Sequence, residues 1–120
     1  MKKNLTLEEI YDLALQYHKK ENYIDAINLY NKILEIEPNH FGSIVNLGVV
    51  LSTIEKYDLA KPLLEKAIEI NSNNVDIYHY LFLVKKFEIL IFLYNQFSFQ
   101  YNDCFFLITY YECDKFYFLF

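Results

Sequence analysis

Histidines, cysteines and carboxylates are the side chains of this sequence that could do chemistry, but their spacing assembles no catalytic or metal-binding site. His18, His40 and His79 are far apart, and none stands four residues from another or beside a candidate nucleophile. Zinc-protease helices, Gly-rich phosphate loops and Ser-centred elbows each require a short motif that this sequence lacks. We therefore expect a protein that is not an enzyme and that uses no cofactor and no metal.

The remaining reactive groups have simpler interpretations. Cys104 and Cys113 make neither a disulfide framework nor a metal-binding pair, so we interpret them as reduced thiols. Carboxylates occur at helical spacing beside lysines, for example Glu65 and Glu69 near Lys66. Such mixtures are typical of a solvated helix face and not of an acid/base pair.

Composition excludes further classes of function. The 120 residues leave room for one small domain. They include 16 acidic and 11 basic residues, a net charge of −5, and every basic residue is Lys. Nucleic-acid binding needs a basic face and commonly Arg, so we expect no nucleic-acid partner. The N-terminus carries no apolar signal core, and we expect a cytoplasmic protein.

A repeat with a period of 34 residues organises the elements that would position these groups. Residues 7–40 and 41–74 are identical at ten equivalent positions, among them Tyr23/Tyr57 and Ala26/Ala60. A period of this length is typical of stacked helix pairs.

Apolar residues at spacings of three and four predict the helices themselves. The expected ranges are residues 7–20, 23–36, 41–54 and 57–70. Thr6 and Glu9 have the spacing of a capping box for the first helix. Small residues such as Ala14 and Gly48 would let paired helices approach closely. We expect a slight kink at Pro62.

The repeat also has a specific residue pattern of large apolar, Leu, small, aromatic, aromatic, Ala, aromatic, Ala and Pro. In the first unit these positions are Ile10, Leu13, Ala14, Tyr17, Tyr23, Ala26, Tyr30, Ile33 and Pro38. In the second they are Ile44, Leu47, Gly48, Leu51, Tyr57, Ala60, Leu64, Ala67 and Ser72. The two units agree at nearly all of these positions, with Ile33 in place of a small residue and Ser72 in place of the proline as the departures that stand out, and the sequence resembles the tetratricopeptide repeat family.

This resemblance implies an all-α fold, a solenoid of helical hairpins. A lead of residues 1–6 would precede two complete repeats, 7–40 and 41–74. A partial third repeat would occupy residues 75–86, before an aromatic-rich tail of residues 87–120. Because stable arrays usually need three or more repeats, we expect marginal stability without the tail or a partner.

In the resembling family the first helix of each pair lines a concave groove that binds a protein or peptide. The partner-facing positions fall here on Tyr11, Leu15, His18, Val45, Asn46, Val49, His79 and Leu83. The row is apolar with polar edges, so we expect it to accept an apolar or amphipathic segment. The family's carboxylate clamp is not expected, because only Asn46 matches its basic and amide positions. A groove that is unused, or filled by the chain's own tail, remains an alternative.

The tail allows other functions. Of its 34 residues 14 are Phe or Tyr, and its longest uncharged run, residues 89–102, is shorter than a bilayer span of about 20 residues. We expect a helix to about Gln100 and strand or disorder beyond it. Unlike the polar cap that normally ends an array, this tail could pack on the second repeat, pair with another copy, lie on a membrane, or result from a frame shift or truncation near Lys86. The alternative functions are therefore a membrane-peripheral or self-associating protein, or a truncated accessory domain of a larger one.

Overall fold

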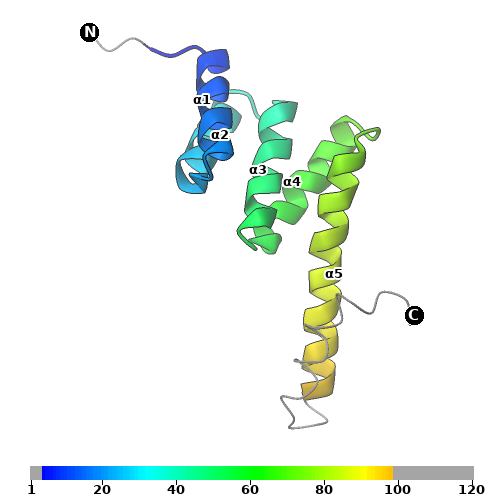
Figure 1. The fold of residues 1–120 in the computed structure, drawn as a ribbon. Coiled ribbons are helices and arrows are strands. Elements are labelled where there is room, and N and C mark those ends of the chain that lie inside the picture. Colours follow the sequence, from blue (N-terminus) through cyan, green and yellow to red (C-terminus); the bar gives the residue numbers. More distant parts are fainter. Residues whose placement is uncertain (1–3, 99–120) are drawn as a thin grey trace. The chain divides into compact units, whose positions relative to one another are not determined.

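Helices make up all the regular structure in residues 4–98, the part of the chain that the computed structural model describes. They are α1 (Leu7–Lys19), α2 (Tyr23–Ile36), α3 (Phe41–Thr53), α4 (Tyr57–Ile70) and α5 (Val75–Ser98), shown in Figure 1. The four helices predicted from the apolar spacing are confirmed to within one residue at each end. The helix predicted to reach about Gln100 is present as far as Ser98. The strand or disorder expected beyond it, and both cysteines, lie outside the described residues.

Side-chain caps fix where the first two helices begin. The Thr6 hydroxyl accepts a hydrogen bond from the backbone N–H of Glu9 at 3.2 Å, and the Glu9 carboxylate accepts one from the N–H of Thr6 at 2.8 Å. This is the predicted capping box, which satisfies two N–H groups that an unprotected helix end leaves without partners. At the start of α2 the side-chain oxygen of Asn22 accepts a longer bond, 3.5 Å, from the N–H of Asp25.

The turns inside the two hairpins share one conformation. Glu21 and Glu55, one repeat period apart, have positive φ angles of 59° and 62°. The N–H of Glu21 donates to the carbonyl of His18 at 3.0 Å, and the N–H of Asn22 donates to that of Tyr17 at 2.9 Å. The same two bonds recur 34 positions later. Each first helix therefore ends in a Schellman motif, with a glutamate in the left-handed position that usually holds Gly.

Packing joins the hairpins into one stack. Helix α1 packs on α2, α2 on α3, and α3 on α4. A Cβ atom added to Gly48 would lie 2.8 Å from Cδ2 of Leu64, so the small residue predicted at this position is required where α3 meets α4. The buried apolar core comprises Ile10, Ala14, Ala26, Tyr30, Ile33, Ile44, Leu47, Val50, Leu51, Ala60, Leu64, Ala67, Ile77, Leu81 and Val84.

The first part of α5 belongs to this stack. Ile77, Leu81 and Val84, spaced by four and three residues, are buried in the same core as α1 to α4. The chain divides into two compact units at this helix, residues 1–85 and residues 86–120. Residues 75–85 of α5 therefore contribute a buried apolar face to the core of the first unit.

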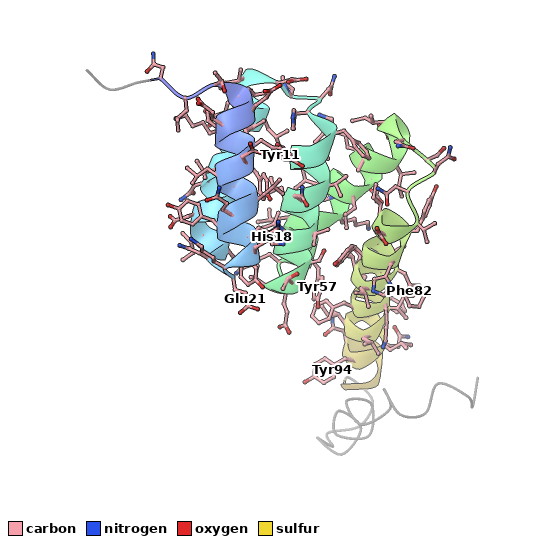
Figure 2. The ribbon with its side chains drawn as sticks, turned by 45° about the horizontal axis from the view of Figure 1, so that its top comes forward. Tyr11, His18, Glu21, Tyr57, Phe82 and Tyr94 are labelled. Carbon is pink, nitrogen blue, oxygen red and sulfur yellow. The ribbon has the colours of Figure 1, made fainter. Side chains whose placement is uncertain are left out.

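One face of α5 lacks the cover that earlier repeats give to the equivalent positions. Ile44 and Gly48 on α3 are buried, and Gly48 lies against Leu64 of α4, whereas their counterparts Tyr78 and Phe82 are 46% and 57% exposed. Figure 2 shows Phe82 on the side of α5 turned away from α3. No second helix of a third hairpin covers this face within the described residues.

The described part of the second unit is the remainder of α5, residues 86–98. Its exposed side chains include Ile89, Ile91, Phe92 and Tyr94, the last of which is marked in Figure 2. Charged residues interrupt the apolar sequence of α5 near its middle. Of the helices in residues 4–98, none combines the length and the apolar character needed to cross a membrane.

Candidate functional site

The residues expected to face a partner lie on α1, α3 and the first part of α5. In Figure 2 these helices stand in front, with α2 and α4 behind them. Tyr11, Leu15, His18, Val45, Asn46 and Val49 are partly buried, and His79 and Leu83 are exposed. We call the surface formed by these eight side chains the A-helix surface.

Tyr11 connects the first repeat to the second. Its hydroxyl oxygen accepts a hydrogen bond from the side-chain amide of Asn46 at 2.9 Å. Its ring meets that of His40 edge-on, with centroids 4.9 Å apart, and packs at a tilt on Tyr30 at 6.3 Å. A Cβ atom added to Gly42 would lie 2.8 Å from Cζ of Tyr11, so the ring rests directly on the start of α3. Tyr11 is therefore part of the contact between repeats as well as of the A-helix surface.

His40 holds the other side of this contact in place. Its Nδ1 accepts a hydrogen bond of 3.1 Å from the backbone N–H of Ser43 and lies 2.8 Å from the Ser43 hydroxyl. His40 is thus the N-cap of α3, a role that was not predicted from the sequence. The cap engages Nδ1 of the imidazole, whose ring also packs against Tyr11.

His18 is also engaged within the fold. Its Nδ1 lies 3.3 Å from the hydroxyl oxygen of Tyr30, and the two rings meet edge-on with centroids 6.3 Å apart. A second edge-on contact places Tyr23 at 6.2 Å. Burial lowers the pKa of His18 and raises the pKa of Tyr30, which favours a neutral imidazole that accepts from the hydroxyl.

Three apolar side chains differ from these engaged residues. Leu15, Val49 and Leu83 occupy the same position in successive repeats, 34 residues apart. Leu15 and Val49 are partly exposed, and Leu83 is 36% exposed. Within the described residues, none of the three belongs to the buried core or to the side chains packed against it. These three side chains are the apolar part of the A-helix surface that does not pack against the core of the described residues.

The polar groups of this surface offer binding but no assembled chemistry. Asn46 is held by Tyr11, and the ring of His79 packs edge-on against Tyr80 with centroids 5.6 Å apart. In residues 4–98 no group of three or more His, Cys, Asp or Glu side chains could hold a metal ion.

Sequence reasoning placed Tyr11 and Asn46 on one surface but did not find the contact between them. Tyr30, Gly42 and His40, which complete that contact, were also missed as a set. The available signal was Gly42, one of only two glycines in the chain, in the first turn of a helix. A glycine there indicates close approach by another side chain.

Two models of a protein family match the chain. Both are described as tetratricopeptide repeat, and they match residues 7–32 and 42–74. These segments fall in the first and second hairpins.

Solved structures are also similar. One, "MamA RS-1 ArsTM double mutant", has a TM-score of 0.65 at 29% identity, and covers 67% of this chain. Another, "MamA 41-end from Desulfovibrio magneticus RS-1", has a TM-score of 0.66 at 28% identity, and covers 68% of this chain. The matches span 45% and 46% of those chains, so this chain corresponds to less than half of either.

Proposed function

The chain is a tetratricopeptide repeat protein, and from this premise we propose that it is a non-catalytic interaction module whose A-helix surface binds an apolar or amphipathic peptide segment. Repeats of this family serve protein–protein interaction, as the sequence pattern already implied. The repeats and the MamA structures support this general role.

The row of Leu15, Val49 and Leu83 carries the proposal. Buried apolar side chains stabilise a fold, whereas these three remain partly exposed at one repeated position. A helix or extended segment lying across α1, α3 and α5 would cover all three in succession. Covering apolar surface of this kind is the main favourable term in peptide binding.

Substitutions in this row test the proposal. Leu15→Glu and Val49→Glu should abolish the enrichment of peptides from a displayed library of random short sequences, because a carboxylate on the contact surface loses its hydration on binding. Tyr11 is a poor choice for this test, since its ring and hydroxyl also join the two repeats.

A matched control separates binding from folding. Leu59 on α4 is 59% exposed and lies off the A-helix surface, so Leu59→Glu should leave peptide enrichment unchanged. All three variants should keep the helical circular dichroism and melting temperature of the parent. Equal enrichment by the parent and the Leu15 and Val49 variants would contradict the proposal.

Absence of chemistry is part of the same proposal. Two of the three histidines make contacts within the fold: His40 caps α3, and His18 lies within hydrogen-bond distance of the Tyr30 hydroxyl.

Self-association is a second candidate function, and the exposed face of α5 favours it. Tyr78 and Phe82 are exposed at positions that are buried in the first two repeats. Another copy of the chain could cover this face. Sedimentation of the full chain should then show a dimer that Phe82→Glu converts to a monomer, and a parent that sediments as a monomer at high concentration would exclude this function.

A further inference from the structure

We infer that the segment bound by the A-helix surface is basic, with Lys or Arg side chains that meet the amino-terminal ends of α1 and α5. This inference rests on the proposed function and names the chemistry of its partner. It starts from three exposed carboxylates beside the apolar row, those of Glu8, Asp12 and Asp76.

These carboxylates gather at one end of the surface. Glu8 and Asp76 occupy equivalent positions at the starts of α1 and α5, two repeat periods apart. Asp12 follows Glu8 by one helical turn and precedes Leu15, the first member of the apolar row, by three residues. The exposed lysines of α1, Lys19 and Lys20, lie at its other end.

No lysine within their own helices neutralises the three carboxylates, and the other basic side chain at a neighbouring helical position, His79 three residues after Asp76, packs its ring against Tyr80. Ion pairs on a helix form between residues three or four apart, and no lysine stands at those spacings from Glu8, Asp12 or Asp76. Glu8 and Asp12 instead stand four apart, an arrangement of like charges that destabilises a helix. Helix polarity favours acids only within the first turn, so it accounts for Glu8 and Asp76 but not for Asp12.

The neighbouring polar groups present acceptors on the same surface. The side-chain N–H₂ of Asn46 donates to Tyr11, which leaves its carbonyl oxygen as the acceptor. Burial raises the pKa of the adjacent Tyr11 hydroxyl, the bond from Asn46 opposes this, and the nearby charge of Asp12 adds to it. An apolar segment with cationic side chains at one end matches such a surface, since each cation would meet an acceptor while its apolar residues cover Leu15 and Val49.

A selection experiment on the full chain tests this assignment. Random short peptides are displayed, enriched on the parent protein at low ionic strength, and sequenced. We expect Lys and Arg to be enriched over the input library together with apolar residues. The affinity of the enriched peptides should fall as salt is added, because salt screens exposed charges.

Charge-neutral variants then locate the effect. The triple variant Glu8→Gln/Asp12→Asn/Asp76→Asn should bind the enriched peptides about tenfold more weakly, which corresponds to the loss of three exposed ion pairs. The matched control, Glu35→Gln/Asp58→Asn/Glu65→Gln, makes the same change of charge on α2 and α4, and should leave affinity unchanged. Asp12→Asn alone should raise the melting temperature while weakening binding, a combination that a purely structural carboxylate would not give.

The outcomes separate this inference from the function on which it rests. Enriched peptides that are neutral or acidic, or that bind the triple variant as tightly as the parent, overturn the basic partner while leaving the surface a binding site. Enrichment that does not depend on Leu15 and Val49 overturns the proposed function itself.

Discussion

Replacing Glu21 and Glu55 with glycine should stabilise the protein. Both residues hold positive φ angles, 59° and 62°, in the turn that closes each hairpin. For a residue with a Cβ atom this conformation costs about 1–2 kcal/mol of folding free energy, whereas glycine adopts it without that cost. Glycine's greater freedom in the unfolded chain offsets about 0.5–1 kcal/mol of this gain.

Alanine variants isolate the backbone contribution. Glu→Ala removes an acid from a helix carboxyl end, where it is unfavourable, but keeps the Cβ atom. Each Glu→Gly variant should therefore exceed its Glu→Ala counterpart by about 0.5–1 kcal/mol in the free energy of unfolding. The two sites share no hydrogen-bond partner, so the double variant should gain about 1–2 kcal/mol. Each kcal/mol corresponds to about 4–8 °C in melting temperature for a domain of this size.

Denaturant unfolding followed by circular dichroism measures these differences. The control is Glu65→Gly, the same substitution at an exposed site in the interior of α4. This variant should instead lower the free energy of unfolding by about 1 kcal/mol. If Glu21→Gly and Glu55→Gly lower stability as Glu65→Gly does, the turns do not hold the left-handed conformation and the reasoning fails.

Three further predictions concern helix packing, a proline inside α4 and the partly buried His18. Gly48→Ala should lower the free energy of unfolding by about 1 kcal/mol despite alanine's better helix propensity, because its methyl group would lie 2.8 Å from Leu64. Thermal melts measure this change, and a net gain in stability would show that Leu64 moves aside freely. Pro62→Ala should raise the free energy of unfolding by about 1–3 kcal/mol, because the proline is exposed and has no N–H to donate to the carbonyl of Asp58 inside α4. An unchanged melting temperature would mean that the helix already accommodates the proline ring. Burial lowers the pKa of His18, so as pH falls below about 6.5 the unfolded chain takes up a proton before the folded chain does, and stability decreases. His18→Gln should lose less stability than the parent between pH 7.5 and 5.5, about a unit either side of that value, and parallel losses in the two proteins would refute the assignment.

The hairpins were predictable because their pattern is local. Spacings of three and four fixed the faces of α1 to α4, and Thr6 with Glu9 marked the first helix start. Gly48 was expected at a close approach between helices, and Leu64 is the side chain that makes it necessary. Each of these inferences needs only neighbours within one repeat or the comparison of two repeats.

The contact between repeats was not predictable in the same way. Tyr11 was expected at a partner-facing position, yet Gly42 and Asn46, which it touches, lie 31 and 35 residues further along the chain. Their counterparts one repeat later, Asp76 and Tyr80, differ in type from Gly42 and Asn46, so periodicity gives no signal for the contact. Glu21 and Glu55 were visible as a repeated identity, but glutamate is not a residue that indicates positive φ.

Tyr11 links binding to folding in this short array. Its ring joins α1 to the start of α3, and the same side chain borders the row that begins at Leu15. In a repeat protein each unit contacts only its neighbours, so the contact of Tyr11 with Gly42 and Asn46 exists only when the two repeats are stacked. A segment that binds across α1 and α3 engages only the stacked form and stabilises it, by about 2.7 kcal/mol when the segment is present at a hundred times its Kd.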